Sequence, residues 1–484
     1  MRNANQHARD DLTMTRASKT IGRAERIAGS AALAALTILA ACSPNDILQV
    51  NNPDVIPPSD VNTPQGLSAL HAGGVGDFSL AYVGNNGGIE GQILVSGSFS
   101  DELGNSETFP TRKEYDQRTI DVRNGTLDQV FRNIHNARRS AEAAAAALVE
   151  FGTTPATDPR VAESYSLAGY TYIQLGETYC SGVPVSTALD DGALEFGDPL
   201  TTTQIFTRAI ARFDAALQYQ ANATVTNLAK VGKARTQLDL GQFAAAAATV
   251  AGVPITFAYN TTHTVALGRQ QNGVFVFINQ NERFSVANLD GGNGLNFRGA
   301  NDPRVPWARL PATDVGFDNA TPQYDQGKYA SETAPLTVAN GVEAELIRAE
   351  AALQAGDATT WLGMLNGLRA NTALYPSAFP AGFPAQFPAL QALTDPGSAT
   401  GRVDLMFRER AFWLYLTGHR LGDLRRLVRQ YGRTAASVFP GGGNAPYVID
   451  GNNKGGTFGN DVNLPVPFNE TNNPHFTQCL DRNA

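Results

Sequence analysis

The chain has 484 residues, enough to bury a large core and, by length alone, to form roughly two or three domains. Charged residues make up 17% of it, the formal net charge is −8, and lysine and arginine are scattered, which argues against a nucleic-acid partner. The 47 glycines and 26 prolines favour an exported protein with long ordered loops between alanine-rich helices.

The N-terminus has the pattern of a secretion signal. Four cations precede a short apolar run over 27–41, and they are Arg16, Lys19, Arg23 and Arg26. The run is shorter than the roughly twenty residues that a membrane-spanning helix needs. Asp10 and Asp11 are unusual in such a signal, so Met14 is an alternative start to Met1.

The apolar run ends in Leu39-Ala40-Ala41-Cys42, which resembles the lipobox of bacterial lipoproteins. We therefore predict a lipoprotein signal peptide over 1–41 and an acylated Cys42 that anchors the mature chain without a span. The alternative is a plain signal peptide in which the cysteine is accidental. Ser43 at the next position implies sorting to the outer membrane. Residues 42–66 are rich in proline and asparagine and are predicted to form a tether.

Helical patterns then dominate two blocks, 67–252 and 336–432. The predicted helices cover 64–84, 124–150, 159–178 and 201–220, a helix–turn–helix over 223–252, and 342–370. Small residues, including Gly169, suit close packing of antiparallel pairs. These pairs resemble tetratricopeptide repeats of irregular period. The predicted fold class is mostly α, with repeat-like helical pairs forming an α-solenoid body in a single domain over 67–484.

Three segments interrupt the helical pattern. Residues 253–335 contain the β-forming stretch "VFVFINQNERFSV", followed by a long glycine- and asparagine-rich loop. Residues 373–400 and 434–475 are rich in proline and glycine. Long loops on a rigid scaffold usually carry function, so we expect a loop-rich, partly β region to bear the binding site.

Two cysteines remain once Cys42 is acylated, namely Cys180 and Cys479. Disulfides persist in the oxidising compartment that the signal peptide implies. We predict a bridge between them that ties the C-terminal tail to the helical body. The alternative is two buried free thiols.

Residues 401–429, "GRVDLMFRERAFWLYLTGHRLGDLRRLVR", form the most specific stretch. Apolar residues occupy nearly every face of the helix predicted here, which indicates a helix buried in the core. Arg420, Asp423 and Arg426 are spaced three apart and are expected to form a charge ladder in a structural rather than a catalytic role.

This stretch resembles the C-terminal signature of the SusD/RagB family of outer-membrane nutrient-binding lipoproteins. The matching residues are Glu409, Arg410, Leu414, Gly418, Arg420, Asp423, Leu424 and Arg426. Trp413 and Thr417 stand where the family usually has acidic residues. "ELIRAEAALQAGD" with "LNGLRAN", the start "CSPNDILQVNNP" and the close "NLPVPFNETNNP" are similar to other family segments. The resemblance spans the mature chain and is weakest over 253–335.

The resemblance implies a helical body that sits on a TonB-dependent (SusC-like) outer-membrane barrel, binds oligosaccharides or peptides and delivers them to the transporter. It implies a lipid-anchored, surface-exposed protein. From the motifs that the sequence lacks, we predict that the protein is not an enzyme and needs no cofactor. A competing hypothesis is a non-enzymatic envelope scaffold that uses the repeat-like helices for protein–protein contacts. The long loops disfavour the scaffold, and a neighbouring gene for such a barrel would separate the two.

The residues themselves show no catalytic or metal-binding motif. The six histidines have no ligand spacing, and there is no nucleophile elbow or phosphate loop. Asp101 and Glu102 are adjacent carboxylates, which rarely satisfy the separation of a glycosidase pair. The stretches over 288–294 and 450–461 could offer oxygen ligands to Ca²⁺ but lack EF-hand spacing, so turns are the favoured interpretation.

Sugar binding requires aromatic faces beside hydrogen-bonding groups. Trp307 lies in a predicted loop and is either a platform or a buried anchor. Tyr82 and Tyr324 are weaker candidates, each beside a glycine- or asparagine-rich turn. Asp101 and Glu102 are candidate polar partners, or they cap a helix. The sequence does not distinguish a glycan cargo from a peptide.

Overall fold

The structure, a computed structural model, describes residues 61–188, 193–219, 221–383 and 388–484. The predicted signal peptide, Cys42 and most of the predicted tether lie outside the described residues. The described residues form one compact unit.

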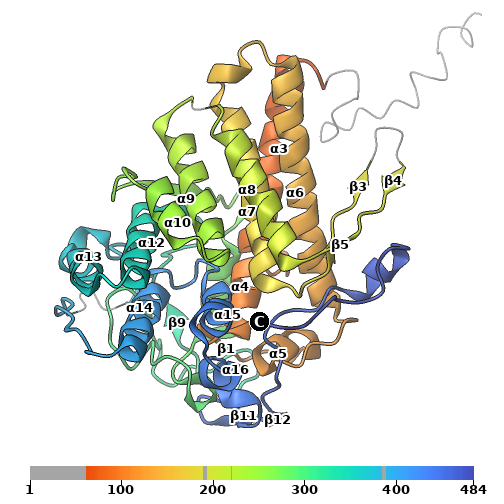
Figure 1. The fold of residues 1–484 in the computed structure, drawn as a ribbon. Helices are drawn as coiled ribbons and strands as arrows, with labels where there is room; N and C mark the ends of the chain where they lie inside the picture. The colour runs from red at the N-terminus through yellow and green to blue at the C-terminus, as the bar shows by residue number, and fades with distance from the viewer. Residues whose placement is uncertain (1–60, 189–192, 220, 384–387) are drawn as a thin grey trace, which may run out of the picture. The chain divides into compact units, whose positions relative to one another are not determined.

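Helices dominate the described residues, which confirms the predicted mostly-α fold class (Figure 1). Their bounds are α3 Pro64–Val83, α4 Gln92–Phe99, α5 Pro110–Gln117, α6 Gly125–Phe151, α7 Pro159–Thr178, α8 Thr202–Ala216, α9 Ala223–Asp239, α10 Phe243–Thr249, α11 Gly273–Phe275, α12 Gly341–Gln354, α13 Ala358–Ala370, α14 Ala399–Trp413, α15 Arg420–Tyr431 and α16 Ala435–Val438.

The strands are short and form two-stranded antiparallel sheets. They are β1 Leu103–Asn105 with β7 Phe284–Val286, β2 Val183–Pro184 with β5 Pro199–Leu200, β3 Thr187–Ala188 with β4 Leu194–Glu195, β6 Ala258–Thr261 with β10 Leu336–Asn340, β8 Trp307–Ala308 with β9 Asp325–Gln326, and β11 Pro446–Ile449 with β12 Asn452–Thr457.

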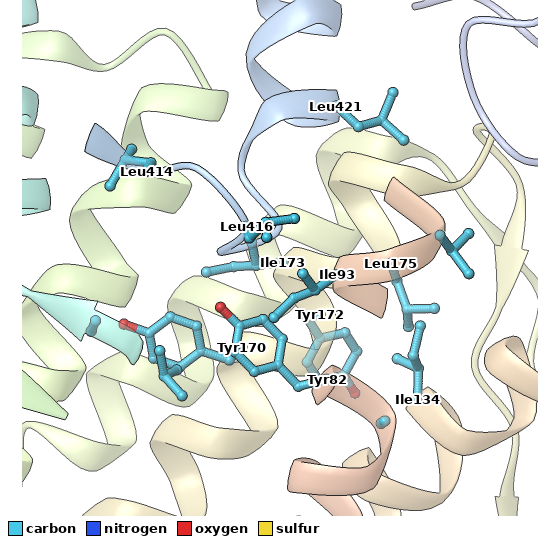
Figure 2. Packing of buried hydrophobic residues seen from close by; sticks show 14 of the residues in the cluster. Tyr82, Ile93, Ile134, Tyr170, Tyr172, Ile173, Leu175, Leu414, Leu416 and Leu421 are labelled. Carbon is cyan, nitrogen blue, oxygen red and sulfur yellow. The ribbon is translucent and has the colours of Figure 1, made fainter. Parts of the chain in front are cut away.

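From α6 to α10, each helix packs against the next in the chain, as expected for repeat-like pairs (Figure 1). Local signals set the boundaries. Thr201 and Gln204 form a reciprocal capping box at the start of α8. Glycine permits the close packing of α7 on α8, because a Cβ at Gly169 would lie 2.7 Å from the Phe213 ring. Side chains of α3, α4, α6 and α7 then meet residues 414–421 in one buried core (Figure 2).

Two predicted elements differ from the structure. The core helix predicted over 401–429 is wrong, because α14 ends at Trp413 and α15 begins at Arg420. Between them, Leu416 and Gly418 have φ angles of 51° and 70°, which a right-handed helix cannot contain. In "VFVFINQNERFSV", only residues 284–286 form a strand. The preceding residues form α11 and the π-helix Val276–Gln280, because the Asn272 side chain caps a helical turn there.

The C-terminal tail is tied to the end of α7 by the cysteine pair that the sequence indicates. Cys180 and Cys479 form a disulfide, with their Cα atoms 6.0 Å apart. Backbone hydrogen bonds flank it, since the Cys180 N–H donates to the Leu464 carbonyl at 2.8 Å and the Leu480 N–H to the Ser181 carbonyl at 2.8 Å.

Candidate functional site

The structure excludes Tyr82 as a ligand contact, contrary to the sequence prediction. Its side chain is 4% exposed and lies in the core beside Tyr170 (Figure 2). Its hydroxyl donates to the carbonyls of Thr417 at 2.8 Å and Thr337 at 3.1 Å. Burial raises its phenol pKa well above the usual range. Tyr82 therefore anchors the turn between α14 and α15 from within the core.

Asp101 and Glu102 are also internal, so the prediction that they contact ligand is wrong. Asp101 accepts from the Arg420 guanidinium at 2.6 and 2.8 Å and from the Leu295 N–H at 2.8 Å. Glu102 accepts from the Leu416 N–H at 2.9 Å. Both carboxylates are fully buried. They hold the turn between α14 and α15 in place.

Glu102 makes stability depend on pH. Burial raises its pKa from 4.5 to about 8, so the folded chain keeps a proton that the unfolded chain releases above pH 4.5. Folding stability from this group is complete below pH 4.5 and is lost as the pH rises through about 8. Glutamine does not titrate, so the Glu102→Gln variant avoids this loss. We expect its free energy of unfolding to rise relative to that of wild type as the pH goes from 5 to 8, by on the order of a few kcal/mol.

Urea unfolding of the Glu102→Gln variant and of wild type at pH 5, 6.5 and 8 measures this gain. Burial raises other acid pKa values as well, for example that of Glu343 to about 7. The difference between variant and wild type is therefore the informative quantity, with the exposed Asp404→Asn as the control. If the free energies of unfolding of Glu102→Gln and wild type change by the same amount over this pH range, the prediction is wrong.

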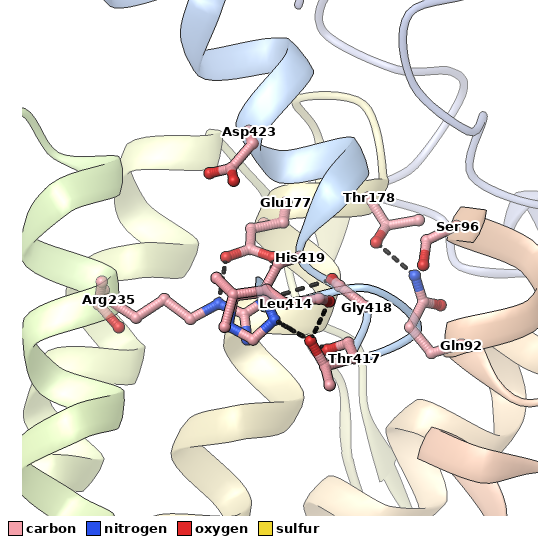
Figure 3. A network of polar contacts seen from close by, with 12 residues as sticks. Gln92, Ser96, Glu177, Thr178, Arg235, Leu414, Thr417, Gly418, His419 and Asp423 are labelled. Atoms are coloured by element: carbon pink, nitrogen blue, oxygen red, sulfur yellow. Dashed lines mark hydrogen bonds and ion pairs between the residues drawn. The ribbon is translucent and has the colours of Figure 1, made fainter. Parts of the chain in front are cut away.

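The signature-like stretch builds a buried polar network rather than a binding site (Figure 3). Arg235 on α9 donates to both carboxylate oxygens of Glu177 on α7, at 2.6 and 2.5 Å. It also donates to the Gly418 carbonyl at 3.1 Å and contacts the His419 Nε2 at 2.8 Å. Because Arg235 can only donate, the His419 Nε2 accepts. Burial and Arg235 lower the His419 pKa well below its ordinary value, so this histidine is neutral.

The charge ladder predicted on α15 forms only between Asp423 and Arg426, and these residues make structural ion pairs. Arg426 contacts Asp423 at 3.1 Å and also pairs with Glu350 of α12. Asp423 further accepts from Arg410 of α14 at 2.8 Å. Arg420 belongs to a separate pair with Asp101. The signature residues therefore join helices distant in the sequence.

Trp307 and Tyr324 come together in the loop-rich region. Their rings meet edge to face with centroids 5.6 Å apart. The Trp307 indole N–H donates to the Arg298 carbonyl at 3.1 Å, and the guanidinium carbons of Arg298 and Arg309 lie 3.5 and 5.6 Å from the centre of the Tyr324 ring. Both aromatic residues are half-buried. Trp307 is therefore an anchored, half-buried residue of β8 and not a loop residue as predicted.

A second aromatic group lies on loops that leave one end of the β1–β7 pair. Asn105 of β1 is opposite Phe284 of β7, so residues 106–109 and 281–283 emerge together. The loop between β8 and β9 joins them, because the Phe317 N–H donates to the Glu282 carbonyl at 2.8 Å. Gly316 permits this approach, since a Cβ there would lie 2.3 Å from the Ser106 Oγ.

These loops present two exposed phenyl rings beside Arg283, and the Arg112 guanidinium carbon lies 5.3 Å from the centre of the Phe109 ring. Phe109 is 51% exposed and Phe317 39%. The Arg283 guanidinium carbon lies 4.0 Å from the centre of the Phe317 ring and 5.8 Å from that of Phe109. Glu107 pairs with Arg283 and, at 2.5 Å, with Arg112, which fixes the guanidinium. We call Phe109, Arg283 and Phe317 the aromatic platform.

The residues of the aromatic platform were not among the binding residues predicted from the sequence. Phe109 precedes Pro110, the first residue of α5, and Phe317 lies in a glycine–aspartate turn, so both positions carried a local loop signal. Their proximity depends on strand pairing across a separation of about 180–210 residues, which no local pattern reveals.

Within the described ranges, no group of three or more histidine, cysteine or acidic side chains is placed to hold a metal ion. The two loops considered for Ca²⁺ lie near one another, since Asp290 and Asp450 line the same hollow. None of the helices in the described part of the chain combines the length and apolar character needed to cross a bilayer.

No protein-family model matches the chain, and no curated protein matches it either. Solved structures do. A SusD superfamily protein from Parabacteroides distasonis shares 13% identity, with a TM-score of 0.61, 86% of this chain covered and 98% of that chain. A structure described as a laminarin-binding SusD-like protein shares 16%, with a TM-score of 0.60 and coverages of 86% and 99%.

A third structure, described as a SusD-like carbohydrate-binding protein from Bacteroides vulgatus, shares 13% identity at a TM-score of 0.52. It covers 74% of this chain and 82% of its own. The chain therefore has the SusD-like fold, which confirms the predicted resemblance. Identities this low establish the fold alone.

Proposed function

We propose that the protein is an outer-membrane lipoprotein that binds oligosaccharides at the aromatic platform and hands them to a TonB-dependent barrel. The observation that carries the proposal is the platform itself, on the loops of a SusD-like fold. Two phenyl rings with 51% and 39% exposure flank a fixed guanidinium. The relatives described as laminarin-binding and carbohydrate-binding support a glycan as the cargo.

The chemistry of the platform suits a sugar. Pyranose rings have apolar CH faces that lie on aromatic rings, and hydroxyl rims that need hydrogen-bonding partners. Phe109 and Phe317 supply the faces. Arg283, whose side chain is 19% exposed, supplies hydrogen-bond donors, and the buried Glu107 holds its guanidinium in place. The half-buried Trp307, in β8, and Tyr324, just before β9, flank the same loop and offer a smaller second contact.

The glycan proposal predicts that the platform rings carry most of the affinity. In calorimetric titrations with laminarin oligosaccharides, and with other glycans chosen from an array, we expect Phe109→Ala and Phe317→Ala each to weaken binding about tenfold or more. Truncating a central aromatic contact commonly costs this much. Phe151→Ala is the matched control, because Phe151 is 42% exposed at the end of α6 and belongs to no aromatic contact of the platform.

Equal loss in the Phe151→Ala variant would indicate a general effect on folding. Binding of a glycan that both platform variants leave unchanged would place the site elsewhere. If the wild-type chain binds peptides from a peptide array and no glycan, the glycan assignment is wrong, while delivery of the cargo to a barrel stays a proposal.

The anchor and the partner need separate tests. Labelling cells with an alkyne analogue of palmitate should mark the wild-type chain and leave Cys42→Ser unmarked, because Cys42 is the proposed acylation site. Co-purification with a TonB-dependent barrel encoded beside its gene should survive platform substitutions. Failure to recover any barrel would favour the envelope scaffold.

A further inference from the structure

A cavity apart from the aromatic platform lies where the segment before α12 meets the residues after α13. Its volume is about 330 Å³, within the range of small-molecule sites. Its lining includes Lys328, Tyr329, Thr337, Leu374, Tyr375 and Trp413, and none of these belongs to the platform. Nothing in the proposed glycan function uses this cavity.

Lys328 supplies a positive charge with no countercharge in the cavity. Its ammonium group has three donors, and one is used on the Tyr415 carbonyl at 2.5 Å. No carboxylate of the described residues forms an ion pair with it. Burial lowers the Lys328 pKa to about 8, so the amine is still mostly protonated at neutral pH. Glu102 is the acid that acts on it, and the raised pKa of Glu102 leaves that acid mostly neutral.

Trp413 and Tyr375 provide an aromatic wall with a spare donor. Their ring centroids are 5.8 Å apart. The Trp413 side chain is 7% exposed, and its indole N–H has no acceptor among the described residues. A buried donor without a partner is costly, so a ligand acceptor reached by a small shift of the indole would be stabilising. The Tyr375 hydroxyl is already used, because it donates to the Arg369 carbonyl.

The surroundings of the cavity carry an excess of positive charge. Arg304 lines the cavity, with its guanidinium carbon 5.0 Å from the centre of the Trp413 ring. It is bound by Asp302 and Glu409. Glu409 is shared with Arg369 and Arg408, so three guanidinium groups face two carboxylates there. Lys328 adds to this excess, which favours an anionic ligand.

We propose that this cavity binds a small organic carboxylate with an apolar body, its carboxylate on the Lys328 ammonium and its body against Tyr375 and Trp413. The volume suits a single-ring compound or the last residue of a peptide better than an oligosaccharide. A free organic acid, a peptide C-terminus and a uronic acid share the carboxylate, and the probes below distinguish them.

Calorimetric titration of the purified full chain tests the ligand class. The probes are phenylacetate, N-acetylphenylalanine and galacturonate, each beside its uncharged amide or neutral sugar. We expect at least one carboxylate to bind about tenfold or more tightly than its uncharged counterpart, because a charge-assisted hydrogen bond is lost with the charge. No binding by any carboxylate, or equal binding of both members of every pair, overturns the proposal.

Two variants locate the site. Lys328→Met keeps the apolar stem and should weaken carboxylate binding about tenfold or more. Lys113→Met is the matched control, because the Lys113 ammonium also donates to one backbone carbonyl, that of Lys454, and also lies near an aromatic ring, yet lies outside the cavity. Carboxylate affinity unchanged by Lys328→Met overturns the assignment of the site.

A measurement on the wild-type chain covers the case in which Lys328→Met does not fold. Amine acetylation read by mass spectrometry should show Lys328 protected by the bound carboxylate and Lys113 unprotected. Equal modification of Lys328 with and without the probe overturns the proposal. Phe109→Ala should keep carboxylate binding, so failure of the glycan proposal and failure of this one are distinguishable.

Discussion

Replacing Arg235 by methionine is expected to lower the free energy of unfolding by about 3–5 kcal/mol. Arg235 has an 8% exposed side chain and binds Glu177 through two hydrogen bonds, as Figure 3 shows. Removing one partner of a buried pair leaves the other charge without compensation, which is more costly than losing an exposed pair. The change also removes a donor from the Gly418 carbonyl and loosens the turn between α14 and α15.

Chemical unfolding followed by circular dichroism measures the effect. Lys233→Met is the matched control, because Lys233 lies on the same helix and pairs with Asp214, whose side chain is 49% exposed. We expect that control to change the free energy of unfolding by less than about 1 kcal/mol. The double variant Arg235→Met with Glu177→Met should recover part of the loss, since it leaves neither charge alone. Similar losses for Arg235→Met and Lys233→Met would show that the buried pair contributes nothing special.

The Arg235 network explains why the signature-like stretch could be recognised but not placed from sequence. The stretch has a recognisable pattern because α15 crosses α7 closely and tolerates few residue types there. At Gly422, for example, a Cβ would lie 2.8 Å from the Glu177 carboxyl carbon. The partners, however, come from far along the chain. Arg420 pairs with Asp101 at a separation of 319 residues. The sequence pattern therefore indicated that Arg420 forms an ion pair but could not identify Asp101 as its partner.

Helix prediction succeeded where local signals are complete and failed where a tertiary contact decides. The interval 159–178 matches α7 because Pro159 and the Asp158 cap mark its start, and amphipathic spacing marks its course. The unbroken helix over 401–429 was predicted because its apolar residues continue past Trp413. The break needs two positive φ angles, which buried Tyr82 and Glu102 stabilise through the carbonyl of Thr417 and the N–H of Leu416.

The candidate site was harder to predict because exposure is a tertiary property. Tyr82 was chosen for the glycine-rich turn that follows it. Yet Phe78 lies four residues earlier and stacks on it at 5.6 Å, a spacing that indicates a buried helix face. Trp307 was predicted to lie in a loop but is the first residue of β8, and its contact with Tyr324 depends on the β8–β9 pairing. Phe109 and Phe317 are exposed only because the surrounding loops leave them uncovered.

The second large effect concerns the disulfide between Cys180 and Cys479. The bond closes a loop with a sequence separation of 299 residues, and in the chain-entropy model such a loop restricts the unfolded chain by about 6 kcal/mol. We therefore expect the Cys180→Ser, Cys479→Ser double variant to unfold at clearly lower urea concentration than wild type. In denatured, unreduced wild-type protein, thiol titration with peptide mapping should find neither cysteine free.

The tail contacts decide how that loss is distributed. Because the N–H groups of Cys180 and Leu480 keep their backbone partners without the bond, the tail should remain paired in the reduced state but open more often. Hydrogen exchange at Leu464 and Leu480 should then accelerate more than exchange in α7, whose interior is packed on both neighbouring helices. The matched control is wild-type protein that is treated with reductant after folding, under conditions in which the disulfide stays closed. If the double variant and wild type unfold at the same urea concentration, loop closure does not stabilise this fold, and the tail is held by its backbone pairing alone.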